Sequence, residues 1–244
     1  MGRNLKPSEK QYSISSPIVV EFVGLPGVGK STLSSRTAAA LANDHNKVSE
    51  PTRHVDNRSG PHRVLSKARF VAEHSFRRPR TALATTRGLL KTNQASTADR
   101  VHVSFNLQYV AGVVARAQSI PCVTLLDQGP YQGVWSVGLH STTEWDSLFD
   151  QFDRFLSQTA PDLVVLVEAD TDTIADRLRS REAGDTRFAP DSPVFDRGVD
   201  GYETLKERIQ SEDTPRSIVV ENKTHADLDA GANRVAETVE SLYD

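Results

Sequence analysis

Cysteine is nearly absent from the sequence, which has only Cys122 among its 244 residues. A single cysteine excludes an intrachain disulfide and fits a reducing compartment. Long apolar runs are missing too: none approaches the roughly 18 residues that a membrane-spanning helix needs. The polar N-terminus also lacks the apolar stretch of a secretory signal. We therefore expect a cytoplasmic protein without a membrane partner.

A strong charge of either sign is also missing, since the formal net charge is -3. This balance alone says little about partners. The chain is long enough to bury a sizeable core. We expect a single α/β domain over residues 17–244, preceded by a loose polar tail of residues 1–16.

The stretch from Gly24 to Ser31 reads Gly-Leu-Pro-Gly-Val-Gly-Lys-Ser and matches the phosphate-binding loop, G-x-x-x-x-G-K-[ST]. In this motif the glycines let the backbone wrap a phosphate, the lysine reaches the β- and γ-phosphates, and the serine hydroxyl ligates Mg²⁺. An apolar run before the loop predicts a buried strand, and the next segment predicts a helix whose positive end meets the phosphates. The predicted nucleotide-binding residues are Gly24, Gly27, Val28, Gly29, Lys30, Ser31 and Thr32.

Five short apolar runs alternate with helical patterns along the chain, and no internal repeat is visible. The alternation predicts a parallel sheet covered by helices on both faces. The predicted strands are residues 18–23, 47–49, 122–126, 163–167 and 217–220. The predicted helices are residues 31–42, 62–76, 81–91, 98–118, 142–158, 171–181, 199–210 and 226–242.

Two acidic residues stand where predicted strands end. Glu50 follows the second strand and precedes a proline, which cannot continue a central strand. Asp127 ends the third strand, where a phosphate-loop protein carries the acidic residue that supports Mg²⁺. Ligands bind at the carboxyl ends of strands in open parallel sheets, so both carboxylates are site candidates, with Ser31 and Asp127 as metal ligands. A plain surface position for Glu50 stays open.

Residues 53–91 carry ten lysines and arginines against only Asp56 and Glu73. A segment this basic suggests contact with phosphates, nucleic acid or an acidic surface, although a solvated helical face also explains it. Aromatic residues are too sparse here for a single-strand stacking platform. We therefore do not expect nucleic acid as a partner.

A second group of arginines surrounds a loop of about residues 182–195. One glycine and two prolines in this loop predict a mobile segment. Arg177, Arg181 and Arg187 are what a lid that closes over a transferring phosphoryl group needs. Surface arginines paired with neighbouring acids are the alternative.

In order and spacing, these segments resemble the thymidylate kinase family of phosphate-loop kinases and its deoxynucleoside kinase relatives, over roughly residues 17–242. The resemblance rests on the phosphate loop and a set of short motifs. These are Glu50-Pro51, Ala98-Asp99-Arg100, Asp127, Tyr131-Gln132-Gly133, Pro161-Asp162 and the spaced arginines.

The resemblance implies a three-layer fold with a sheet in the order 2-3-1-4-5, ATP and Mg²⁺ as cofactors, an arginine-bearing lid and a small-molecule acceptor, and it allows a homodimer. It also implies that Arg100 faces the acceptor, and it adds Glu50, Arg53 and Gln132 as substrate-binding candidates. The catalytic candidates are Lys30, Glu50, Asp127, Arg177, Arg181 and Arg187.

The sequence departs from the family pattern around the acceptor. Gln128 stands where the family usually has an arginine after the aspartate of the third strand. Ser49 and Pro26 replace an arginine and an acidic residue of the thymidylate kinases. These differences argue against thymidine monophosphate as the acceptor. The residues expected to bind ATP, the phosphate donor, are retained.

Three hypotheses about function stay open. The first is an ATP-dependent phosphotransferase acting on a nucleoside monophosphate or similar small acceptor, since the wider match is to that family. The second is a kinase of a nucleoside or another hydroxyl compound, such as an antibiotic or sugar, with Glu50 as the base. The third is a nucleotide-driven switch without an acceptor. Asn222-Lys223 resembles the guanine-reading motif of GTPases, but His225 replaces its aspartate.

Overall fold

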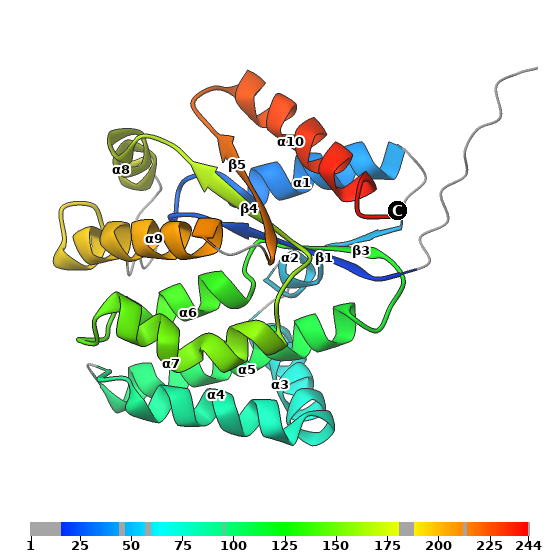
Figure 1. The fold of residues 1–244 in the computed structure, drawn as a ribbon. Helices are drawn as coiled ribbons and strands as arrows, with labels where there is room; N and C mark the ends of the chain where they lie inside the picture. The colour runs from blue at the N-terminus through cyan, green and yellow to red at the C-terminus, as the bar shows by residue number, and fades with distance from the viewer. Residues whose placement is uncertain are drawn as a thin grey trace, which may run out of the picture.

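The computed structural model describes residues 16–43, 47–56, 60–94, 96–180, 188–211 and 214–243. The tail expected over residues 1–16 therefore lies outside the described residues except for Ser16. The expected lid is described only from Phe188 onward. Figure 1 shows the described chain as a sheet between layers of helices.

The strand before the phosphate loop, β1 (Ile18–Val23), is the middle strand of a five-stranded sheet. The others are β2 (Val48–Ser49), β3 (Val123–Leu126), β4 (Leu163–Glu168) and β5 (Arg216–Glu221), in the order β2-β3-β1-β4-β5. All four pairings are parallel, and Val20 of β1 pairs with Leu125 on one side and Leu163 on the other. The predicted parallel sheet and its order are confirmed.

Helices cover both faces of the sheet. In the described chain they are α1 (Lys30–Asn43), α2 (Pro51–Asp56), α3 (Gly60–Arg77), α4 (Pro79–Lys91), α5 (Thr97–Ala117), α6 (Pro130–Gly138), α7 (Trp145–Gln158), α8 (Thr171–Arg179), α9 (Pro193–Ser211) and α10 (His225–Glu240). α1 and α10 pack together on one face, α5 and α6 on the other, and α3 and α4 lie beyond α5 (Figure 1). None of the helices in the described ranges has both the length and the apolar content to cross a bilayer.

Three helices differ from the sequence-based expectation, which gave no helix over Pro51–Asp56, where α2 lies. α9 begins at Pro193, six residues before the expected start at residue 199, and proline suits a first helical turn because it needs no N–H partner there. α6 was not expected at all. Its N-cap is Gly129, which offers no side chain to the unpaired N–H groups of the first turn, so the local start signal is limited to Pro130 at the first helical position.

α3 approaches α5 most closely at Gly112. A Cβ on Gly112 would lie 2.6 Å from the backbone oxygen of Phe70, and a backbone atom cannot move aside as a side-chain tip can. The ring of Phe70 also meets the edge of Tyr109, with centroids 5.7 Å apart. Glycine is therefore required for α3 to pack against the helix that lines the site described below.

Gly112→Ala should separate α3 from α5 and lower the free energy of unfolding by roughly 1–3 kcal/mol, although alanine favours helix over glycine. Gly60→Ala is the matched control, because nothing lies within 4 Å of a Cβ built there. Urea unfolding followed by circular dichroism measures both variants. An unchanged stability of Gly112→Ala would contradict the close packing.

Candidate active site

The phosphate loop joins β1 to α1 and depends on two glycines with left-handed backbone angles. Gly27 has a φ of 89° and Gly29 a φ of 102°, which other residues rarely adopt. A Cβ on Gly29 would also overlap the side-chain nitrogen of Asn222. Both the backbone angles and the packing therefore demand these glycines.

Lys30 begins α1, and its side chain folds back over the loop. The ammonium nitrogen donates to the backbone oxygen of Gly24 at 2.6 Å and to that of Leu25 at 3.0 Å. The positive charge thus lies at the loop whose backbone the motif assigns to phosphates. A phosphate oxygen of a bound nucleotide can replace these two carbonyl oxygens as hydrogen-bond acceptors of the Lys30 ammonium group.

Three side chains from separate elements meet at the end of β3. The Ser31 hydroxyl donates to Asp127 Oδ2 at 3.2 Å, and the Thr52 hydroxyl of α2 donates to Oδ1 at 2.6 Å. Hydroxyl and carboxylate oxygens are the ligands that Mg²⁺ prefers. The described residues form no cluster of three metal-binding His, Cys, Asp or Glu side chains. The site thus fits Mg²⁺ bound by few protein oxygens and by nucleotide phosphates.

Glu50 lies at the end of β2, beside this group. Its Oε1 accepts a hydrogen bond from the Ser34 hydroxyl at 3.2 Å, and Arg53 pairs with it at 3.4 Å. Only 16% of the Glu50 side chain is exposed. The structure therefore holds Glu50 and Arg53 together, next to the second turn of α1.

Arg177 supports the phosphate loop indirectly, through Asn222. Its Nη2 donates to the backbone oxygen of Asn222 at 3.2 Å, and the Asn222 amide donates to the backbone oxygen of Val28 at 2.5 Å. The other terminal nitrogen, Nη1, is buried and has no hydrogen-bond partner within the described chain. Arg181 and Arg187 lie outside the described residues.

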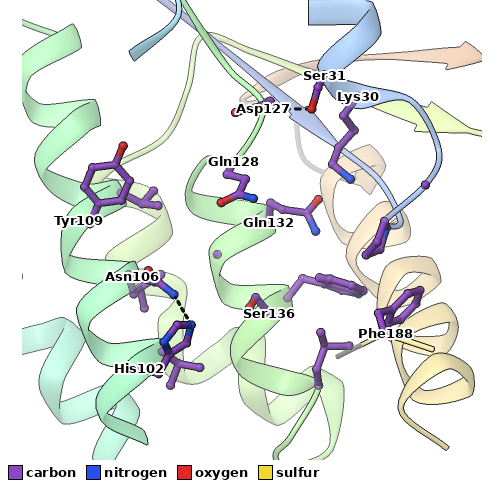
Figure 2. A pocket seen from close by; sticks show the side chains of 18 of the residues that line it. Lys30, Ser31, His102, Asn106, Tyr109, Asp127, Gln128, Gln132, Ser136 and Phe188 are labelled. Atoms are coloured by element: carbon purple, nitrogen blue, oxygen red, sulfur yellow. Dashed lines mark hydrogen bonds between the residues drawn. The ribbon is translucent and has the colours of Figure 1, made fainter. Parts of the chain in front are cut away.

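A pocket of about 620 Å³ opens beside the phosphate loop. Figure 2 shows Lys30, Ser31 and Asp127 at one end, with side chains of α5 and α6 facing each other below them. Most of its polar lining carries no fixed charge: the lining includes His102, Asn106, Gln128, Gln132, Ser136 and His140, with Trp135, Leu139 and Phe188 as apolar walls. Phe188 is buried against Trp135, with ring centroids 5.7 Å apart.

Positive charge is scarce in this pocket. Among the described residues, its lining contains no arginine, and its only lysines are Lys30 and Lys67. Lys67 lies over the ring of Tyr109, 4.9 Å from its centroid. Glu50, Arg53 and Arg100 are not among the described lining residues either, so their substrate-binding roles stay predictions, whereas Gln132 does line the pocket.

Glu21, a fully buried acidic residue in β1, was not expected from the sequence to take part in the site. Its two oxygens accept hydrogen bonds from the backbone N–H groups of Gln132 at 2.8 Å and Tyr131 at 3.2 Å. Glu21 therefore takes the place of the N-cap side chain that α6 lacks. The Gln132 side chain in turn accepts from the N–H of Gly24 at 3.1 Å, which ties the start of α6 to the phosphate loop.

Burial raises the pKa of Glu21 to about 8, against hydrogen bonds from the backbone of Gln132, Tyr131 and Gly129, which lower it. A Cβ on Gly129 would overlap the Glu21 carboxyl group. The sequence offers two signals for this contact. One is an acidic residue inside an apolar strand, and the other is the glycine and proline that begin a helix far along the chain.

A family model described as an AAA domain matches residues 19–205, more than half of the chain. The chain belongs to this AAA domain family. A search of curated proteins finds no match to its sequence.

Solved structures show what this member of the AAA domain family resembles in fold. A deoxyadenosine kinase from M. mycoides with products bound aligns with a TM-score of 0.57 at 12% identity, over 92% of this chain and 100% of that one. A thymidylate kinase from Ehrlichia chaffeensis aligns with a TM-score of 0.51 at 11% identity, over 91% and 98%. The phosphate-loop kinase fold inferred from the sequence is confirmed.

Thr52→Val should weaken Mg²⁺ binding roughly tenfold, because it removes a hydrogen bond that orients the Asp127 carboxylate. The readout is the Mg²⁺ concentration that half-saturates binding of a fluorescent ATP analogue. Thr204→Val, at a half-buried threonine of α9, is the control. An unchanged Mg²⁺ requirement in a folded Thr52→Val protein would refute this role.

Glu21→Gln should change the pH dependence of stability. Because the folded pKa of Glu21 is raised from 4.5 to about 8, its contribution is fully present below about pH 4.5 and is lost as the pH rises through about 8. The stability of the native chain relative to Glu21→Gln should therefore fall between these pH values. Urea unfolding across this range measures it, and parallel pH profiles would contradict the assignment.

Proposed function

We propose that the protein is an ATP-dependent phosphotransferase whose acceptor is an uncharged small molecule with a hydroxyl group, such as a nucleoside. One observation carries the proposal: the phosphate loop and Asp127 open directly onto a pocket whose described lining holds no arginine and few residues of fixed charge. The neighbouring solved kinases support phosphoryl transfer as the reaction class.

The donor half needs positioning and charge neutralisation more than covalent chemistry. In the proposed reaction, the loop N–H groups and Lys30 bind the phosphates, and Ser31 and Asp127 hold Mg²⁺. The bound Mg²⁺ neutralises charge on the phosphate oxygens. Asn222 and Arg177 keep the loop backbone in place through the bonds described above.

The acceptor half favours a neutral molecule. A monophosphate acceptor carries about two negative charges at neutral pH, and arginine is the residue best suited to bind them. The described lining has no arginine, and Gln128 stands where the related kinases usually have one. A monophosphate, which the sequence alone favours, therefore becomes the second candidate, supported by Lys67 in the lining.

Glu50 is the proposed base for a hydroxyl acceptor. The acceptor oxygen bonds to the γ-phosphorus, the bond to the β–γ bridging oxygen breaks, ADP leaves, and the hydroxyl proton goes to a carboxylate. Glu50 lies outside the described pocket lining, whereas Asp127 and Asp99 belong to it. These two aspartates are therefore the alternative candidates for the base. Glu50→Gln separates them: a large loss of kcat supports Glu50, and unchanged turnover excludes it.

The test is ADP formation with a panel of nucleosides, other hydroxyl compounds and nucleoside monophosphates, with the phosphorylated product identified by mass spectrometry. At least one neutral compound should accelerate ADP formation and become phosphorylated. Lys30→Ala should abolish transfer, and Asn106→Ala should raise the KM of that acceptor roughly tenfold by removing a hydrogen-bonding group of the pocket.

Two results would oppose the proposal. Acceleration by monophosphates alone would assign the anionic acceptor class instead. ATP hydrolysis that no compound accelerates and that yields no phosphorylated product would favour a nucleotide-driven switch.

A further inference from the structure

Large exposed apolar side chains gather on one part of the molecule. Within the described chain, all of those that are substantially exposed lie on α3, α4 or the first turns of α5: Val64, Leu65, Phe76, Leu83, Leu90 and Val101. Exposed apolar side chains concentrated in one region often mark an interaction site.

The sharpest feature is the corner between α3 and α4. Phe76, in the last turn of α3, is 90% exposed, and the exposed arginines Arg77, Arg78 and Arg80 follow it at once. The corner lies on the outer layer of helices, away from α1 and α10 (Figure 1). A bulky exposed ring is thus followed directly in the chain by three exposed arginines.

The outward face of α4 continues this pattern. Leu83, Arg87 and Leu90 follow one another at helical spacing, with leucines 50% and 65% exposed, and Arg80 and Lys91 flank them. The opposite face, with the buried residues Thr81, Thr85, Gly88 and Leu89, packs inward. We call Phe76, Arg80, Leu83, Arg87, Leu90 and Lys91 the α4 face.

The charge of α3 and α4 is strongly positive. Residues 60–91 contain eight lysines and arginines but only one acidic residue, Glu73. Glu73 is already paired with Arg77 at 3.4 Å and with Arg116 at 3.9 Å. No ion pair joins Arg80, Arg87 or Lys91 to another described residue. The positive charge of the α4 face is therefore free to act on an anionic partner.

We infer that the α4 face binds the surface of a bilayer rich in anionic lipids. Apolar side chains interleaved with arginine and lysine match such a surface, because the cations pair with lipid phosphates while the apolar groups enter the acyl boundary. The inference replaces the sequence-based expectation of no membrane partner, which rested on the lack of a membrane-spanning run, because surface contact needs no such run. The inference does not depend on the proposed phosphotransferase activity.

Other occupants fit the α4 face less well. A second copy related by a twofold axis would bring the face that carries Arg80, Arg87 and Lys91 against an identical cationic face, and like charges at an interface are repulsive. Nucleic acid would satisfy the cations but leave Leu83 and Leu90 without apolar partners. A bilayer surface satisfies both kinds of side chain.

The experiment is sedimentation of the full chain with vesicles of phosphatidylcholine alone or mixed with phosphatidylglycerol, at low and high salt. The chain should bind the mixed vesicles at low salt and be released by high salt. Arg80→Gln/Arg87→Gln should weaken binding roughly tenfold or more, and Phe76→Ser should do the same by removing an inserted ring. Arg216→Gln/Arg234→Gln removes two cations of β5 and α10 and should bind as the native chain does.

All of the substituted side chains of the α4 face are exposed, so circular dichroism should show folded variants. Absence of binding to mixed vesicles, or equal loss in the β5 and α10 control, would overturn the inference. A dimer in light scattering that Phe76→Ser dissolves would assign the face to a second copy. Duplex DNA that binds the α4 face and displaces the vesicles would assign it to nucleic acid.

Discussion

The buried carboxylate of Glu21 is the constraint on which the rest of the site depends. A helix that begins at Gly129-Pro130 has no local cap, and a carboxyl group placed among apolar strands is costly unless it is hydrogen-bonded. The carboxyl oxygens of Glu21 accept hydrogen bonds from N–H groups in the first turn of α6. These bonds satisfy both the buried carboxyl group and the uncapped helix, and they hold α6 against β1. The Gln132 side chain then reaches the N–H of Gly24.

This contact links the two halves of the proposed active site. The donor half is built on the phosphate loop. Lys30 bonds to the loop backbone at Gly24, and the Ser31 hydroxyl donates to the Asp127 carboxylate at the end of β3. The acceptor half lies between α5 and α6, below that edge (Figure 2). Gln132 lines the pocket and also bonds to the phosphate loop, so it directly connects the two halves.

The sequence predicted the features that depend on local pattern. The phosphate loop, the five strands and Asp127 at the end of β3 follow from motif and periodicity, and the strand order followed from the family resemblance. α6 and Glu21 were missed because their contact joins residues 110 and 111 positions apart. The basic character of residues 53–91 was visible in composition, but the exposure of Phe76 and Leu90 depends on which face of each helix packs inward.

A crystal structure with a non-hydrolysable ATP analogue, and with Mn²⁺ in place of Mg²⁺, would show how nucleotide, metal and pocket are arranged. We expect an anomalous scattering peak within ligand distance of the Ser31 hydroxyl and the Asp127 carboxylate, and a γ-phosphate that faces the pocket between α5 and α6. A metal bound elsewhere, or a γ-phosphate that points away from this pocket, would contradict this expectation.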